Sequence, residues 1–285
     1  MVTTSTTSPA AHQGADRTPK HLVNPTTLDI GGESMRLKDR VALITGASSG
    51  IGLETARLFA GEGASVVVVA RRKERLAALV DQIATAGGKA IAVAGDVTRE
   101  GDIQNAVQTA VATFGRLDIV VNNAGLMDRM DPVADLDDDT WNAVIGVNLT
   151  GPMRLFRAAI PEMEKVGGGV FVTIASVGGI RGARAGAAYT ASKHGVIGLA
   201  MNVAYAYAKR GIRSNVIAPG GVSTEILTGK DLNAEGEKIY MAGIASNIRM
   251  GEPMEVARAA LFLTSDESSL VNGAVVTADA GWTAY

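Results

Sequence analysis

A tyrosine and a lysine stand four positions apart, at Tyr189 and Lys193, in a stretch with a helical apolar pattern. Residues at i and i+4 share one face of a helix, so the phenol and the ammonium are expected to lie close together. Free tyrosine has a pKa of about 10, and a nearby positive charge favours its phenolate. The pair can therefore move the proton of a substrate hydroxyl, with Tyr189 as general acid/base and Lys193 lowering the phenol's pKa. The structural alternative is a core tyrosine beside a solvated surface lysine.

Two further polar residues interrupt apolar segments. Ser176 ends an apolar run, thirteen residues before Tyr189. Asn148 falls inside an otherwise apolar helical stretch, where a polar amide is poorly explained as a core residue. Taken alone, Ser176 can also be a cap and Asn148 a satisfied buried amide.

A glycine-rich turn follows the apolar run Val41–Thr45 and precedes a helical pattern. Gly46 permits a sharp turn, Gly50 lets the backbone approach a pyrophosphate, and Gly52 removes a side chain where helix meets strand. The amide donors and positive dipole end of the helix complete a phosphate site. A plain tight turn is the alternative. The residues predicted to bind are Gly46, Ser48, Ser49, Gly50, Ile51 and Gly52.

The spacing Thr45-Gly46-x-x-x-Gly50-Ile51-Gly52 resembles that of the short-chain dehydrogenase/reductase family, and further motifs of this family occur in its order over residues 36–285. The resemblance implies an NAD(P)(H)-dependent oxidoreductase that transfers a hydride between the nicotinamide and a secondary alcohol or ketone. A catalytically silent, dinucleotide-sensing binding protein of the same fold is the alternative.

The resemblance also assigns roles to the four polar residues. Tyr189 would be the general acid/base, and Lys193 would also hold the nicotinamide ribose. Ser176 would hold the substrate oxygen beside the phenol, and Asn148 would position a water that links Lys193 to solvent. A binding module would not need all four residues, which argues against the silent alternative.

The choice of cofactor depends on the end of the second apolar run, Ser65–Ala70. An enzyme that prefers NAD usually carries a carboxylate there, but this chain continues from Ala70 into Arg71 and Arg72. A guanidinium matches phosphate geometry in a fork, so the sequence favours NADP(H), with NAD as the other candidate. A solvated basic start to a helix is the structural alternative. Ser49 departs from the pattern, because many NADP-dependent relatives carry a second basic residue there.

The resemblance supplies the remaining cofactor contacts. Asp96 and Val97 resemble the adenine contact, with a helix N-cap as the alternative for Asp96. The adjacent Asn122 and Asn123 need hydrogen-bond partners if they are buried. The motif that contains them is expected to lie against the adenine ribose, and the turn after the sixth strand to flank the nicotinamide, unless it is a plain turn. These contacts are Asn123, Ala124, Gly125, Pro219, Gly220, Val222 and Thr224.

Strand and helix signals that alternate along the chain must position these residues. The runs are apolar on both faces, which predicts parallel strands covered by helices on two sides, in a doubly wound (Rossmann) α/β fold with seven strands. We expect a single catalytic domain over 36–285 and a flexible N-terminal arm over 1–35. The strands are expected at Val41–Thr45, Ser65–Ala70, Ala90–Ala94, Asp118–Asn122, Val170–Ala175, Arg213–Ala218 and Ala274–Ala278. The helices are expected at Gly52–Gly61, Lys73–Ala86, Arg99–Phe114, Asp137–Lys165, Ala187–Arg210 and Pro253–Ser265.

Composition restricts the partners. The net charge is −2, which gives no electrostatic footprint for nucleic acid or an anionic membrane, and no apolar run is long enough for a membrane span. The chain has no cysteine, which excludes a thiolate zinc site and fits a cytoplasmic location. The acidic run 135–139 is interpreted as the start of a helix, so no metal is expected. The resemblance implies a homotetramer built through the helices Asp137–Lys165 and Ala187–Arg210.

Substrate recognition is expected from three loops at the carboxyl edge of the sheet, Leu126–Pro132, Val177–Ala185 and Glu225–Ile248. The third loop reads as a mobile helical lid with an apolar inner face. Its inner residues are predicted to be Ile226, Leu227, Ile239, Tyr240, Met241 and Ile244. An apolar lining favours a small, uncharged alcohol or ketone, alicyclic or sugar-like, as the substrate. His194 points about 100° away from Lys193 around the helix and is not expected in the site.

Overall fold

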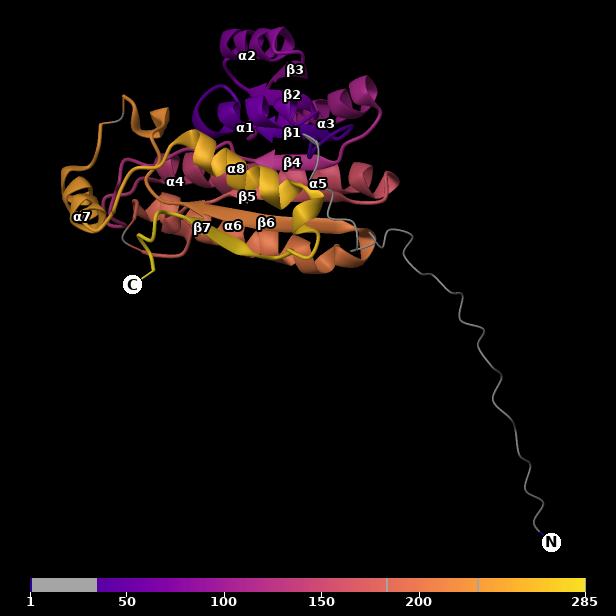
Figure 1. Ribbon diagram of the computed structural model, residues 1–285. Coiled ribbons are helices and arrows are strands. Elements are labelled where there is room, and N and C mark those ends of the chain that lie inside the picture. Colours follow the sequence, from indigo (N-terminus) through magenta and orange to yellow (C-terminus); the bar gives the residue numbers. More distant parts are fainter. Residues whose placement is uncertain (2–34, 183, 230, 285) are drawn as a thin grey trace. The chain divides into compact units, whose positions relative to one another are not determined.

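Seven parallel strands form one sheet in the order β3-β2-β1-β4-β5-β6-β7 (Figure 1). The computed structural model describes residues 1, 35–182, 184–229 and 231–284. The predicted arm over 1–35 therefore lies almost wholly outside the described residues. The strands are β1 Val41–Thr45, β2 Ser65–Ala70, β3 Lys89–Ala94, β4 Ile119–Asn122, β5 Gly169–Ile174, β6 Ile212–Pro219 and β7 Val275–Ala278.

The helices between the strands begin and end close to the predicted positions. The predicted helix Asp137–Lys165 is interrupted by a π-helical turn at Gly146–Thr150, and the predicted helix Ala187–Arg210 ends in a separate 3₁₀ turn at Ala208–Arg210. The α-helices are α1 Gly50–Gly61, α2 Lys73–Thr85, α3 Glu100–Phe114, α4 Asp138–Ile145, α5 Gly151–Lys165, α6 Ala187–Ala206, α7 Ala234–Ile244 and α8 Pro253–Thr264.

The two faces of the sheet bury two separate cores. Val41 and Leu43 of β1 point into a core shared with α3, α5 and α6, whereas Ala42 and Ile44 point into a core shared with α1, α2 and α8. Successive side chains of a strand point to opposite faces, so a central strand must be apolar throughout. The doubly wound, seven-stranded fold predicted from these apolar runs is confirmed.

The strand order reverses between β1 and β4, which lie side by side in the middle of the sheet. In an open parallel sheet, ligands bind outside the carboxyl ends of the strands at such a switch point. The glycine-rich turn follows β1 and the Asn122-Asn123 pair ends β4, so the fold brings two predicted cofactor-binding segments together at this point.

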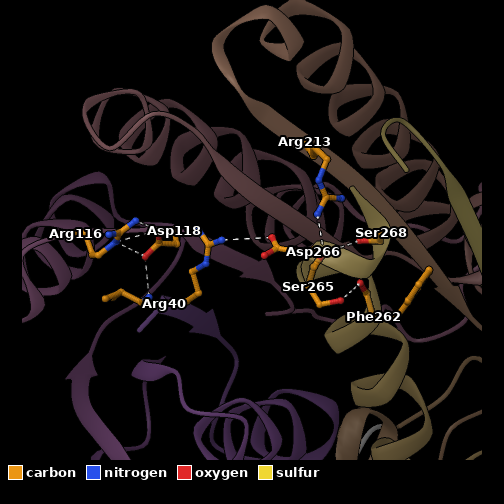
Figure 2. Close-up of polar contacts among 9 residues, drawn as sticks. Arg40, Arg116, Asp118, Arg213, Phe262, Ser265, Asp266 and Ser268 are labelled. Atoms are coloured by element: carbon orange, nitrogen blue, oxygen red, sulfur yellow. Dashed lines mark hydrogen bonds and ion pairs between the residues drawn. The ribbon is translucent and has the colours of Figure 1, made fainter. Parts of the chain in front are cut away.

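The opposite ends of β1 and β4 are fastened by a polar network (Figure 2). The carboxylate of Asp118, only 3% exposed, accepts the backbone N–H of Val41 at 2.9 Å and the Nη2 of Arg116 at 2.6 Å. Arg40 pairs with Asp118 at 3.6 Å and with Asp266, beyond α8, at 3.4 Å. The network contacts the ends of the strands that lie away from the glycine-rich turn, and we interpret it as structural.

Local geometry explains two other features of the sequence. The acidic run is the start of α4, where the side chain of Asp137 accepts the backbone N–H of Thr140 at 2.6 Å. Ala280, which stands where the resembling family often has glycine, has a φ of 54° in the left-handed region that favours glycine. Among the described residues, no helix is long and apolar enough to cross a membrane.

Candidate active site

Tyr189 and Lys193 lie in the first two turns of α6 and are both buried. The Nζ of Lys193 lies 5.4 Å from the centre of the Tyr189 ring and donates to the carbonyl of Ile174 at 2.9 Å. This carbonyl belongs to the last residue of β5, so the lysine bridges α6 and the carboxyl edge of the sheet. The spacing of the two residues therefore does bring the phenol and the ammonium together, in a buried place.

Ser176 follows β5 and lies beside the phenol. Its hydroxyl lowers the pKa of the phenol of Tyr189, and it accepts the backbone N–H of Gly178 at 3.0 Å. A Cβ at Gly178 would lie 3.4 Å from the Oγ of Ser176 and 3.6 Å from two carbons of the tyrosine ring, so the serine hydroxyl and the ring lie around the same glycine. Two hydroxyl groups, one on a loop and one on a helix, thus point at the same place.

Asn148 lies in the π-helical turn between α4 and α5. Such turns are rare and occur frequently at functional sites. The side chain accepts the N–H of Leu126 at 2.7 Å and donates to the carbonyl of Leu126 at 2.8 Å and to the hydroxyl of Ser192 at 3.0 Å. It fastens the loop after β4 to α6. A Cβ at Gly125 would lie 3.8 Å from both the Oδ1 of Asn148 and the Nζ of Lys193, which places the asparagine and the lysine around the same glycine.

Burial shifts the pKa values of the pair. Burial raises the pKa of Tyr189 to about 12, although the hydrogen bond from Ser176 acts in the opposite direction. Burial also lowers the pKa of Lys193 to about 8. Burial therefore dominates the pKa of both groups in the chain by itself, and the expectation that Lys193 together with an oxidised nicotinamide lowers the pKa of the phenol stays a prediction. A cation bound beside them would be needed to favour the phenolate.

The glycine-rich turn has the backbone that a phosphate-binding turn requires. Gly46 and Gly50 have φ values of 67° and 56°, which L side chains rarely adopt. α1 begins at Gly50, and Ser49 makes no side-chain cap, so the first N–H groups of α1, including those of Ile51 and Gly52, face outward without an intrahelical acceptor. This helix terminus is suited to hold an anion.

Asn123 braces this turn. Its side-chain amide donates to the carbonyl of Thr45 at 2.9 Å, and the hydroxyl of Thr45 accepts the N–H groups of Asn123 and Ala124, each at 3.1 Å. The expectation that a buried asparagine needs partners holds for Asn123. It fails for Asn122, whose buried Nδ2 has no hydrogen-bond partner among the described residues.

Arg72 lies over the glycine-rich turn. Its guanidinium donates to the hydroxyl groups of Ser48 and Ser49, each at 2.8 Å from Nη2. The same side chain reaches Glu225 at 3.1 Å, and Arg75 reaches this carboxylate at 2.7 Å. Sequence reasoning missed Glu225, because only the fold brings it beside residues about 150 positions earlier. Arg71 is exposed and forms none of these contacts.

Asp96 and Val97 follow β3 at the same edge of the sheet. The side chain of Asp96 accepts the N–H and hydroxyl of Thr98 at 2.9 and 2.8 Å, and α3 begins only at Glu100. The alternative interpretation of Asp96 as the N-cap of this helix is therefore wrong. Val97 packs against Gly151 of α5, where a Cβ would lie 3.1 Å from its carbonyl oxygen.

The turn after β6 approaches the glycine-rich turn. A Cβ at Gly50 would lie 3.1 Å from the Cγ2 of Thr224. Pro219 ends β6, the N–H of Gly220 donates to the carbonyl of Ala278 at 3.0 Å, and Val222 bridges to Gly251.

A hollow of about 420 Å³ lies between the two turns, and it is lined by Ser49, Gly50, Glu54, Ser223, Thr224, Glu225 and Pro253. A larger one, of about 510 Å³, lies beside β7 and touches neither Tyr189 nor Lys193.

The three predicted substrate loops meet in one apolar cluster that contains Tyr189. Each loop contributes apolar side chains, and α7 approaches so closely that a Cβ at Gly236 would collide with the carbonyl oxygen of Met130. Ile239 and Met241 are exposed, so their predicted place on the inner face is wrong. The cluster residues from the loops are Leu126, Met127, Met130, Ala185, Ile226, Leu227, Leu232 and Tyr240.

The residues present fit a dinucleotide. An outward-facing helix terminus, two hydroxyls with a guanidinium above them, and a hollow between two turns lie along one edge of the sheet, next to the buried phenol and ammonium. His194 is exposed and hydrogen-bonds to the carbonyl of Thr190, outside this arrangement, as predicted.

Comparisons with known proteins agree with this geometry. Residues 40–235 match the family described as short chain dehydrogenase. A 3β-hydroxysteroid dehydrogenase from Eggerthella lenta is 43% identical over 251 residues, covering 87% of this chain and 96% of that protein. A cyclohexanol dehydrogenase from an Acinetobacter species is 38% identical, covering 88% of this chain and 97% of that protein.

A solved structure agrees as well. The crystal structure of a candidate NAD(P)-dependent gluconate 5-dehydrogenase from Beutenbergia cavernae, with NADP bound at low occupancy, is 36% identical and superposes with a TM-score of 0.79. The match covers 88% of this chain and all of that one. Because the relatives are named as dehydrogenases, a catalytically silent binding protein is not favoured.

Proposed function

The chain belongs to the short-chain dehydrogenase/reductase family, and we propose that it is an NADP(H)-preferring enzyme in which Tyr189 exchanges the proton of a secondary alcohol or ketone. As a member of this family it is an oxidoreductase that acts on alcohols or ketones with NAD(P). The observation that carries the proposal is the buried phenol of Tyr189 beside the hydroxyl of Ser176, which lowers the pKa of the phenol, with the ammonium of Lys193 on the same helix face.

The proton chemistry follows from these side chains. During reduction, the substrate oxygen accepts hydrogen bonds from the hydroxyl groups of Ser176 and Tyr189. The nicotinamide, when bound, supplies the hydride to the carbonyl carbon. The electron pair of the C=O π bond moves to the oxygen, which takes the proton of Tyr189, and the resulting phenolate lies near the ammonium of Lys193. Oxidation of the alcohol reverses each of these transfers.

The neutral phenol suits this role at rest. Its pKa of about 12 keeps the proton on Tyr189 at neutral pH, ready to be donated. For alcohol oxidation the phenol must lose its proton, and the positive charge of an oxidised nicotinamide together with Lys193 would favour that loss. Asn148 fastens the loop after β4 against α6, and we propose that it positions a water through which Lys193 exchanges protons with solvent.

Preference for NADP(H) is supported by the group of Arg72, Ser48 and Ser49 beside the glycine-rich turn. One guanidinium and two hydroxyls offer several donors to a 2′-phosphate, and β2 ends in Ala70 without a carboxylate that would repel it. We propose that Asp96 and Val97 contact the adenine, that Ala124 and Gly125 lie against its ribose, and that the turn from Pro219 to Thr224 holds the nicotinamide end.

The substrate class follows from the apolar cluster around Tyr189. All three loops contribute apolar side chains to this cluster, which favours an uncharged substrate. Two relatives are named for alicyclic alcohols, a hydroxysteroid and cyclohexanol. We therefore propose an alicyclic secondary alcohol or ketone. The homotetramer and the cytoplasmic location stay predictions from the family resemblance and the composition.

Replacing the phenol tests the proposal. Tyr189→Phe should lower kcat for cyclic ketones by a factor of about 100 to 10,000, the range that general acid catalysis supplies. Its dissociation constant for NADPH should stay within a few-fold of that of the unaltered enzyme. Tyr207→Phe, at the end of α6, is the matched control and should keep full turnover. Retained turnover in Tyr189→Phe would refute the role assigned to the phenol.

A further inference from the structure

A buried carboxylate lies directly beside the start of α6 and takes no part in the mechanism above. Asp128, in the loop after β4, is fully buried, with 0% of its surface exposed. Its Oδ2 accepts the backbone N–H of Tyr189 at 2.8 Å, and its Oδ1 accepts the N–H of Met130 at 3.1 Å. The backbone of Gly186 lowers the pKa of this carboxylate. The carboxylate therefore contacts the first turn of the helix that carries the phenol.

The surrounding backbone is shaped around this carboxylate. A Cβ at Gly186 would lie 2.4 and 2.5 Å from the two carboxylate oxygens, closer than such atoms approach in real structures. Met130 adopts a φ of 64°, which is strained for a residue with a side chain, while its N–H points at Asp128. The missing side chain of Gly186 and the strained backbone of Met130 both make room for the carboxylate of Asp128.

The charges that face Asp128 do not neutralise it. Among the described residues, no lysine or arginine forms an ion pair with Asp128, and Arg129 of the same loop reaches Asp131 instead, at 3.9 Å. The other titratable groups nearby are the buried Asp131, the phenol of Tyr189 and, from α7, the partly buried phenol of Tyr240. The attraction that holds the charge comes from backbone N–H groups and the positive end of α6.

We propose that Asp128 is a positioning residue for Tyr189, whose buried carboxylate fixes the first turn of α6 and whose negative charge opposes ionisation of the phenol. This inference rests on the proposed function of Tyr189 as the proton donor. A hydrogen bond to the backbone of the reacting residue restrains the place of the phenol relative to Ser176. The charge of Asp128 acts in the same direction as burial, because both raise the pKa of Tyr189.

The charge of Asp128 affects the pH range in which Tyr189 can donate its proton. Lys193 and Asp128 act on one phenol with opposite signs, so the chain sets the ease of proton loss by the balance between them. With Asp128 charged, Tyr189 keeps its proton up to a higher pH, so the form that can donate to a ketone persists over a wider alkaline range. Removing this charge should lower the pKa of Tyr189, so that the phenolate forms at lower pH.

An experiment that does not depend on turnover tests the charge effect. Ultraviolet difference titration measures tyrosinate, and subtracting the titration of Tyr189→Phe isolates Tyr189. In Asp128→Asn, corrected with the double variant Asp128→Asn/Tyr189→Phe, the midpoint should fall by about half a pH unit or more. Asp131→Asn removes another buried carboxylate of the same loop without touching the N–H of Tyr189, and its midpoint should match that of the unaltered chain.

Kinetics test the positioning effect. Asp128→Asn should lower kcat for ketone reduction about tenfold or more, move the alkaline limb of its pH profile to lower pH, and leave the dissociation constant for NADPH unchanged. Gly186→Ala keeps the charges of Asp128 and Lys193 but displaces the carboxylate of Asp128. It should therefore lower kcat as well. It also serves as the second variant if Asp128→Asn does not fold. Asp131→Asn should keep kcat within about twofold.

Two results would overturn the inference. One is a folded Asp128→Asn with the midpoint and kcat of the unaltered chain. The other is a Gly186→Ala variant with unchanged kcat. Failure of the proposed function shows itself separately, as turnover that survives Tyr189→Phe, and the titration of Tyr189 remains valid in that case.

Discussion

The side-chain amide of Asn123 occupies the space in which a side chain at Gly52 would lie: a Cβ there would be 2.4 Å from the asparagine Nδ2. Asn123 is the first residue after β4, and Gly52 lies in the first turn of α1. The amide also donates to the carbonyl of Thr45 at 2.9 Å. The two strands at the switch point of the sheet are thus joined through a contact that only glycine at position 52 permits.

Gly52→Ala should therefore displace Asn123 and open the glycine-rich turn. We expect the dissociation constant for NADPH, measured by fluorescence titration, to rise at least tenfold, and the free energy of unfolding to fall by about 1–3 kcal/mol, as overpacking costs. Gly61→Ala is the matched control at the other end of α1, where an added Cβ meets nothing within 4 Å. It should keep the affinity and stabilise the helix slightly. Equal affinities in both variants would contradict the argument.

The contacts of Arg72 predict which arginine selects the cofactor. Arg72→Ala should lower kcat/KM for NADPH by about ten- to a hundredfold, the usual value of a hydrogen bond to a charged group, and change kcat/KM for NADH much less. Arg71→Ala should have the smaller effect, because Arg71 does not reach Ser48 or Ser49. A clear preference of the unaltered enzyme for NADH would overturn the assignment of NADP(H).

Glu225 gives this prediction a second arm. Its carboxylate takes up donors of Arg72 and Arg75 that a 2′-phosphate would need. Glu225→Gln should lower KM for NADPH at low ionic strength, and the difference should shrink as salt screens the exposed charges. If the unaltered enzyme and Glu225→Gln have the same KM for NADPH at every salt concentration, Glu225 does not compete with the 2′-phosphate.

The buried ammonium of Lys193 predicts how stability depends on pH. Its pKa is about 8 in the folded chain and 10.5 in the unfolded one, so between these values the unfolded chain binds more protons. The free energy of unfolding should therefore rise with pH over this window, by up to about 3 kcal/mol. Urea denaturation from pH 7 to 10 should show this rise relative to Lys193→Met. Parallel curves for the two proteins would contradict the low pKa. Above pH 10 the titration of Tyr189, with its pKa of about 12, acts with the opposite sign.

Ala280 offers a simple test of backbone strain. Because its φ of 54° lies in the left-handed region, Ala280→Gly should raise the free energy of unfolding by roughly 1 kcal/mol, despite the greater freedom of glycine in the unfolded chain. Ala259→Gly, inside α8, is the control and should lower it by about 1 kcal/mol. Thermal unfolding of both variants measures these changes. A lower free energy of unfolding in Ala280→Gly as well as in Ala259→Gly would mean that position 280 is not strained.

The order and type of the elements, and the residues of the candidate site, can be inferred from the amino-acid sequence. Seven apolar runs that alternate with helical patterns admit a parallel sheet covered on both faces, because such strands have no polar face to expose to water. The i, i+4 spacing of Tyr189 and Lys193 fixes their common helix face, and the backbone freedom of Gly46 and Gly50 is written in the residue type. These inferences need only local geometry.

The burial of these groups and their long-range neighbours depend on the tertiary structure. Burial, which depends on every element packed around α6, raises the pKa of Tyr189 in the chain by itself. Asp128 lies beside Tyr189, and Glu225 beside Arg72, although 61 and 153 positions separate them in the chain. No periodicity or motif carries such pairs, because long-range contacts arise from the way that whole helices and loops pack.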